Sequence, residues 1–304
     1  MRCATRATCA ALLGVAWLPQ ACRSEVPSPA ASAPVSAPVS LSDDKLLFMG
    51  NGSTLTPPSG TPCDTVAQAC SGGGGGSLTW LHNFNPNALF SVGGEYETIA
   101  NSHWSFGSLT GALGGGSQSA KWNAYAEAHV GSGEGAGISG SQHWDYEVYA
   151  LGVAGTFDSK VTVLVETRQY DIDLTHGNLP KLNVNYLVSP RLMLGAAYAH
   201  SVSGNLGTDL TSVRLDQYNP SFNWFIGGAF GHVSPAIIIA PNAANPQGTF
   251  VPSPPFREGI AGISKTFTRT EWALLGDFQK VGDTKRLIIT VTCTWHLHAP
   301  VRPG

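Results

Sequence analysis

The stretch KRLIITVTCTWHL, residues 285–297, carries the clearest strand pattern of the chain. Its apolar side chains stand at every second position, at Leu287, Ile289, Val291, Cys293, Trp295 and Leu297. Successive side chains of a β-strand point to opposite faces, so this alternation predicts a strand with one apolar and one polar face. A sheet packed on a protein core would show the same pattern. What the apolar face contacts therefore has to be decided from the rest of the chain.

The N-terminal residues have the layout of a secretory signal peptide. Two arginines precede an apolar run, and the small residue Ala21 follows it. We expect residues 1–21 to be removed and residues 22–44, rich in Pro, Ser and Ala, to form a linker. A lipid-modified Cys22 is the alternative. In either case the mature chain has left the cytoplasm.

The composition argues against a soluble protein and against a helical membrane protein. Only 12% of the 304 residues are charged, about half the usual share for a soluble domain. After the signal region, however, no stretch reaches the roughly 18 apolar residues that a membrane helix needs.

The cysteines offer one candidate cross-link. Cys63 and Cys70 are close in sequence and in an oxidising compartment would form a disulfide; two free thiols are the alternative. Their spacing does not supply the ligands of a zinc site, so we expect no metal. Cys293 lies on the apolar face of its strand and is interpreted as a small hydrophobic residue.

Two-faced segments recur from Ser77 to Leu297 and predict many strands. Their ranges are 77–86, 88–100, 103–115, 119–131, 142–156, 160–173, 180–189, 191–203, 209–218, 221–233, 257–267, 271–281 and 285–297. Short links alternate with mostly longer ones, among them 131–142, 174–180 and 234–256.

This arrangement predicts an all-β fold, a transmembrane antiparallel up-and-down β-barrel. Single-chain bacterial outer-membrane barrels have an even number of strands, with short turns on the periplasmic side and longer loops outside. Residues 45–55 supply the missing first strand, which gives 14 strands over residues 45–298 and a short tail at 299–304. A 12-stranded barrel is the alternative if residues 45–55 form a short periplasmic segment and two of the predicted hairpins merge.

Aromatic and charged residues indicate which face meets lipid. Tryptophans near strand ends on the apolar face predict an aromatic girdle, namely Trp122, Trp144, Trp272 and Trp295. The opposite faces carry more charge than a water-free core tolerates. The predicted lumen-lining residues are Glu95, Glu97, Glu127, Asp145, Glu147, Glu166, Arg168, Arg214, Asp216, Glu271, Asp277 and Arg286. The apolar face of residues 285–297 is therefore predicted to face lipid.

The last strand also resembles the C-terminal insertion signal of Gram-negative outer-membrane barrel proteins, although the tail HAPVRPG follows it. The resemblance implies an outer-membrane location and recognition by the barrel-assembly machinery. The segments SPRLMLGAAYAH and FREGIAGISKTFTRTEWALLGDF are similar to the YaiO-like barrels, which are associated with envelope polysaccharide systems.

Two segments could suggest enzyme chemistry, and neither supports it. GSGEGAG, residues 131–137, lacks the helical pattern that must follow a dinucleotide-binding loop, so a flexible turn is favoured. His200 falls on the strand face opposite Ser201 and Ser203, which argues against a serine esterase. We therefore expect no enzyme activity and no cofactor.

The sequence predicts a porin, an outer-membrane channel for small polar solutes. Acidic residues dominate the predicted lumen, and an acidic lumen favours cations. Two alternatives stay open: the charges form ion-pair ladders within the wall, or residues 234–256 plug the channel. Other candidate functions are an accessory barrel of polysaccharide export, with a periplasmic partner on the linker, and an outer-membrane lipid hydrolase. Outer-membrane lipids are expected partners and nucleic acid is not.

Overall fold

A computed structural model describes most of the chain after residue 42. The described residues are 43–56, 72–85, 87–99, 102–116, 120–137, 140–172, 175–204, 207–219, 221–232, 238–239, 249–250, 255–281 and 284–297. The predicted signal peptide, Cys63–Cys70 disulfide and C-terminal tail lie outside them, as does nearly all of the predicted plug segment. The predicted linker also lies outside them except for Asp43 and Asp44, which begin the first strand instead. Within these ranges, no helix has the length and apolar character needed to span a bilayer.

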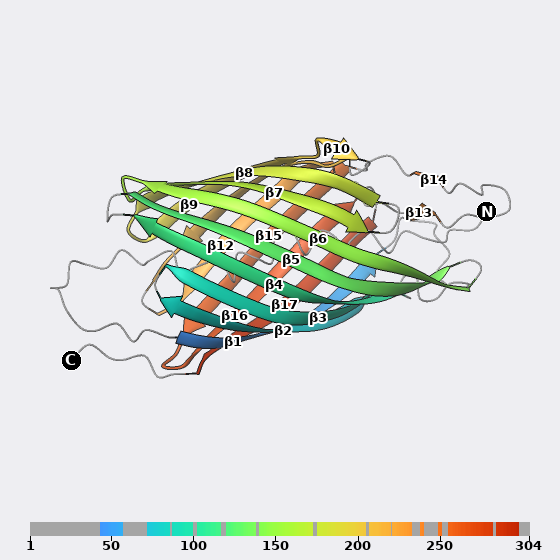
Figure 1. Cartoon of the computed structure of the whole chain (residues 1–304), viewed down its shortest axis with the longest axis horizontal. Coiled ribbons are helices and arrows are strands. Elements are labelled where there is room, and N and C mark those ends of the chain that lie inside the picture. Colours follow the sequence, from blue (N-terminus) through green and yellow to red (C-terminus); the bar gives the residue numbers. More distant parts are fainter. Residues whose placement is uncertain are drawn as a thin grey trace.

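The described chain forms one closed antiparallel β-barrel of 14 long strands, which confirms the predicted fold (Figure 1). Each strand pairs with its neighbours in sequence order, and β1 closes the barrel on β17, from Lys45 opposite His296 to Thr56 opposite Lys285. Residues 45–55 therefore do form the first strand.

The long strands are β1 Asp43–Thr56, β2 Gly73–Asn85, β3 Ala88–Ile99, β4 Ser102–Gly116, β5 Ala120–Gly137, β6 Gly140–Phe157, β7 Val161–Ile172, β8 Thr175–Ser189, β9 Leu192–His200, β11 Asp209–Gln217, β12 Asn223–His232, β15 Pro255–Thr266, β16 Thr270–Val281 and β17 Thr284–His296. Three two-residue strands complete the fold: β10 Ser203–Gly204, on the edge of β8, and the pair β13 Ile238–Ile239 and β14 Thr249–Phe250.

The two ends of the barrel differ in their connections. At one end, here called the turn end, only short links join the strands, from 86–87 between β2 and β3 to 267–269 between β15 and β16. The other, the loop end, carries the two longest links, 57–72 and 233–254. In the turn at 158–159, Asp158 and Ser159 have φ of 47° and 55°, and Lys160 N donates to Phe157 O at 3.0 Å. Positive φ at both central residues matches the twist of the flanking strands.

Two loops expected at the loop end are instead mostly strand. Residues 131–137 continue β5, residues 140–142 begin β6, and β8 starts at Thr175. The glycines of GSGEGAG suggested a flexible turn, yet the ladder from β4 through β5 to β6 runs through them. Backbone hydrogen bonding across the sheet does not need side chains, so it persists where the side-chain pattern fades.

The last strand, β17, shows which face of the sheet lies on the outer surface of the barrel and which lies in its interior. Leu287 is 44% exposed on the outside, whereas Ile288 is 7% exposed in the interior. The same alternation repeats around the barrel, so that leucine, valine, isoleucine and aromatic side chains cover the outer surface. An exposed apolar surface of this extent is suited to lipid.

In the interior, aromatic rings lie over glycines of the neighbouring strand. The rings of Phe225 and Tyr125 occupy the positions that a side chain would take at Gly262 and Gly152, where an added Cβ would approach ring carbons to 2.4 and 2.2 Å. At Gly131 an added Cβ would meet Ser105 O at 2.0 Å. Glycine is therefore required at these three positions, because an aromatic ring or the neighbouring backbone already fills the space that a side chain would take.

The candidate channel lumen

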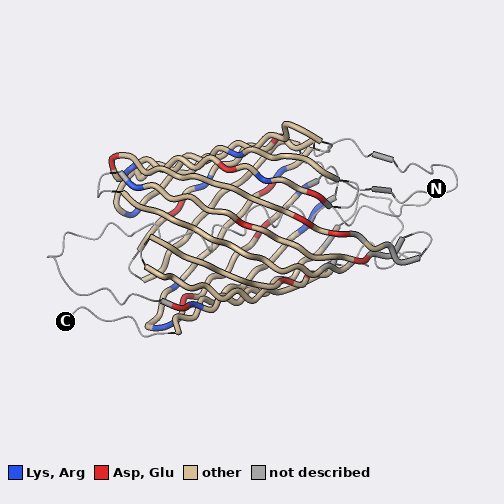
Figure 2. The backbone as a smooth tube through the Cα atoms, in the orientation of Figure 1, with Lys and Arg blue, Asp and Glu red and all other residues tan. Residues whose placement is uncertain are grey.

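Charged residues occur along the strands as well as at the ends of the barrel (Figure 2), and many of them lie in the inward phase of their strands. Of the predicted lumen residues, Glu97, Glu166, Arg168, Asp216 and Arg286 are buried in the interior, and Glu95, Glu127, Arg214, Glu271 and Asp277 are half-buried in the inward phase of their strands. The structure brings most of them together in three groups.

The first group surrounds Arg168 on β7. Its Nε donates to Glu166 Oε1 at 2.7 Å and its Nη2 to Glu127 Oε2 at 3.2 Å. The Tyr125 hydroxyl donates to Glu166, and His129 contacts Glu127. Two carboxylates thus share one guanidinium, which is the ladder arrangement that the sequence left open.

The second group surrounds Arg286 on β17. Its Nη2 donates to Glu97 Oε1 at 3.2 Å and to Ser53 Oγ at 3.3 Å, joining strands at the two ends of the described chain. On β15 and β16, Gln279 Nε2 donates to Glu258 Oε1 at 3.1 Å and to Asp277 Oδ2 at 2.7 Å.

Glu258 and Asp277 form a pair of neighbouring interior acids on β15 and β16. One neutral amide lies between their carboxylates, and within the described residues no cation forms an ion pair with either of them. Glu258 Oε2 and Asp277 Oδ1 are buried and have no hydrogen-bond partner in that part of the chain. Like Glu95, whose Oε1 is also buried without a hydrogen-bond partner, this acidic pair is therefore not neutralised by an ion pair within the described residues.

The third group lies near the turn end on β11. Arg214 Nε donates to Asp216 Oδ1 at 2.8 Å, and the guanidinium lies 3.9 Å above the centre of the Phe225 ring. In the adjoining turn, burial and then the nearby Asp216 charge raise the pKa of Tyr218 to about 12.

Two of the predicted lumen residues, Asp145 and Glu147, face outward instead of into the lumen. Asp145 is 86% exposed and Glu147 is exposed, both on the outer face of β6, while Tyr146 and Val148 are buried inside. The sequence phase was wrong because residues opposite each other on paired strands share a face, and Glu147 lies opposite the outward Val130. Sliding a strand by one residue exchanges its two faces.

The sequence interpretation also missed some lumen residues. Glu258, Gln279 and Lys181 lie in the inward phase of β15, β16 and β8. The signal that identifies Glu258 as a lumen residue is its alternation with the outward Gly259 and Ala261.

The tryptophan girdle lies toward the turn end. Trp122, Trp272 and Trp295 are exposed on the outer surface near the turn-end limits of β5, β16 and β17, and Trp80 joins them from β2. The side chain of Trp144 is outside the described part of the structure.

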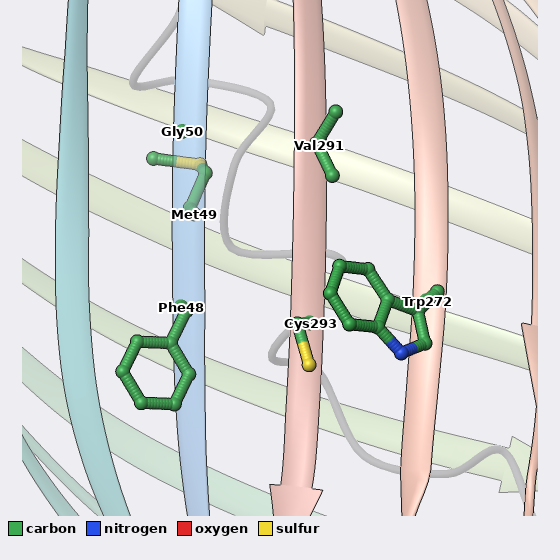
Figure 3. Close-up of a pocket in the computed structure, with 6 residues that line it drawn as sticks. All are labelled: Phe48, Met49, Gly50, Trp272, Val291 and Cys293. Atoms are coloured by element: carbon green, nitrogen blue, oxygen red, sulfur yellow. The ribbon is translucent and has the colours of Figure 1, made fainter.

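On the same outer surface, a hollow lies between Phe48 and Trp272 (Figure 3). Cys293 stands between the two rings, with Val291 and Gly50 further along the strands. Cys293 is a free thiol in this lipid-facing position. In the described ranges, no group of three or more His, Cys, Asp or Glu side chains could hold a metal ion.

Comparisons with known proteins identify the fold. No protein-family profile and no curated protein sequence matches the chain. Among solved structures, the CymD monoaromatic hydrocarbon channel matches with a TM-score of 0.58 at 10% identity, over 85% of this chain and 90% of that one. The chain has the fold of the outer-membrane channels.

Two further structures agree with this outer-membrane barrel assignment. A mutant of the TodX monoaromatic hydrocarbon channel matches with a TM-score of 0.53 at 8% identity, over 86% of this chain and 91% of that one. A Pseudomonas aeruginosa FadL homologue matches with a TM-score of 0.50 at 11% identity, over 85% and 91%. Fold and lipid-facing surface together place the barrel in the outer membrane. Short turns lie on the periplasmic side of such barrels, so we expect the turn end there.

Proposed function

We propose that the chain is an outer-membrane channel for small hydrophilic solutes and that its lumen prefers cations. A charged, hydrogen-bonded interior supports a water-filled path, because burying these groups in a dry core would be costly. The observation that carries the preference for cations is the acidic pair Glu258 and Asp277, to both of which the Gln279 amide donates and with which no cation forms an ion pair in the described part of the chain. Acidic groups lining a pore raise the local concentration of cations and repel anions.

Ion pairs with arginine leave one side of the lumen, the wall formed by β15 and β16, as the place for cation selectivity. Arg168 is bonded to two glutamates and Arg286 to Glu97, so these parts of the wall are largely neutralised. In the wall formed by β15 and β16, no ion pair within the described residues neutralises Glu258 or Asp277, and two carboxylates that share one site retain about one negative charge between them. Selectivity is therefore assigned to Glu258 and Asp277.

Single-channel recording in a planar bilayer under a KCl gradient tests this proposal. The refolded protein is expected to give discrete conductance steps with a cation-biased reversal potential. Replacing the acidic pair, with Glu258→Gln and Asp277→Asn together, should lower the cation-to-anion permeability ratio at least twofold.

The matched control removes two acids from the outer face, with Asp145→Asn and Glu147→Gln, and should leave the permeability ratio unchanged. A folded wild-type barrel that never conducts would overturn the channel proposal. An unchanged ratio in the Glu258 and Asp277 double variant would overturn the assignment of selectivity to that pair.

A further inference from the structure

Three basic side chains form a row on the outer surface at the loop end. Arg257 on β15 lies opposite Lys280 on β16, and Lys280 lies opposite Lys285 on β17. We call these three residues the basic row. Their inward neighbours Glu258, Gln279 and Arg286 are buried, so the basic row points outward. Arg257 and Lys285 are exposed and Lys280 is half-exposed.

The row stands at the border of the apolar surface. Two residues further along their strands, Phe278 and Leu287 are 48% and 44% exposed on the same face. The link 282–283 between β16 and β17 follows on the other side of the row. A basic side chain at this height lies where lipid headgroups meet the hydrocarbon region, and the apolar residues below it lie among acyl chains.

The basic row places three cationic side chains at directly opposite positions on three successive strands and spans about 10 Å at ordinary strand spacing. Phosphate groups suit the row, because arginine binds phosphate through two parallel hydrogen bonds and lysine binds it as a point charge.

The basic row is local to one side of the barrel. On the opposite side, the outer surface near the loop end carries the exposed acids Glu134, Asp145, Glu147 and Asp171. A rim that attracted anions without preference for position would not have this distribution. Asp209 on β11 is also exposed at the loop end, two strands from Arg257, so the basic surface is confined to β15, β16 and β17.

We propose that Arg257, Lys280 and Lys285 bind the phosphate groups of a phosphorylated lipid of the outer leaflet, whose acyl chains contact Phe278 and Leu287. This site faces away from the lumen. It depends only on the barrel fold and its membrane location, so its test is independent of whether the channel conducts.

Native mass spectrometry of the full chain in detergent tests the proposal with bis-phosphorylated lipid A and with the same lipid after phosphate removal. Wild type should retain the phosphorylated form. The triple variant Arg257→Gln, Lys280→Gln, Lys285→Gln should bind it at least tenfold more weakly. A control variant removes the same charges from exposed turn-end positions, with Lys121→Gln, Lys160→Gln and Arg191→Gln, and should bind as wild type does.

Folding of each variant is checked by the heat-dependent gel mobility of the barrel, so that weaker binding is scored only for folded protein. Equal binding of phosphorylated and dephosphorylated lipid by wild type would overturn the proposal. So would equal binding of phosphorylated lipid by wild type and the triple variant. If inorganic phosphate at equal concentration displaced the lipid fully, the row would be a free-phosphate site and the assignment to a lipid would fail.

Discussion

At the scale of single residues, the interior is held by a few side chains with several partners each. Arg168 is 3% exposed and neutralises both Glu127 and Glu166, while Arg286 links Glu97 to Ser53. A buried charge that loses its partner is strongly destabilising, whereas an exposed charge contributes little. Arg168 and Arg286 are therefore structural parts of the wall, and exposed arginines of the same chain are not.

Replacing Arg168 with Met should lower the free energy of unfolding by about 3 kcal/mol or more, because Glu127 and Glu166 would lose their shared cation. Urea unfolding in detergent or lipid vesicles, followed by gel mobility, measures the change. The control Arg191→Met lies in an exposed turn and should change stability by less than about 0.5 kcal/mol. Equal effects of the two substitutions would refute the structural role of Arg168.

At the scale of elements, β6 shows that a strand's faces are set by its neighbours. Taken alone, HWDYEVYA has its apolar residues in the phase of Tyr146 and Val148, which favoured that face as the outer one. Pairing with β5 places His129 opposite Val148 and Val130 opposite Glu147, so the faces are exchanged. Leu151 and Val153, further along the same strand, carry the lipid-facing surface.

An aspartate on the inner face of β6 should be far more disruptive than one on the outer face next to it. Val148 is 0% exposed, so Val148→Asp should lower stability by about 3 kcal/mol or more through an unpaired buried charge. Tyr149→Asp, at the exposed neighbouring position, should have a smaller effect. The yield of heat-modifiable barrel and its urea midpoint measure both. If Tyr149→Asp were more destabilising than Val148→Asp, Tyr149 would lie on the inner face of β6, as the sequence alone predicted.

At the scale of the whole molecule, the barrel surrounds its polar interior with a lipid-facing surface, so its charges act on the lumen together. Acids outnumber basic residues among the described inward positions, and the guanidinium groups are committed to ion pairs. The proposed cation preference rests on the pair Glu258 and Asp277, which no ion pair within the described residues neutralises and which acts through the field across the lumen.

This field should be weakened by salt. Screening lengths are about 10 Å at 0.1 M and about 3 Å at 1 M ionic strength, so the cation-to-anion permeability ratio should fall toward one as KCl rises over that range. Reversal potentials at a fixed concentration ratio and increasing mean KCl concentration measure the effect. A ratio that is independent of salt would indicate selection by direct ion coordination instead of by the lumen field.

The sequence by itself determined the architecture of this protein. Alternation of side chains is local, so the two-faced strands, the short turns, the need for residues 45–55 as first strand and the lipid-facing side of residues 285–297 could all be predicted. The inward phase of Glu97, Glu127, Glu166 and Arg168 followed from the same rule.

Only the tertiary structure decided how these strands are set against one another. Glu97 and Arg286 are 189 residues apart in sequence and meet only when the barrel closes. The faces of β6, the amide-bridged pair of Glu258 and Asp277, and the row of Arg257, Lys280 and Lys285 depend on strand register. Register is set by cross-strand pairing, and a shift of one residue would reverse which side chains face lipid and which face the lumen.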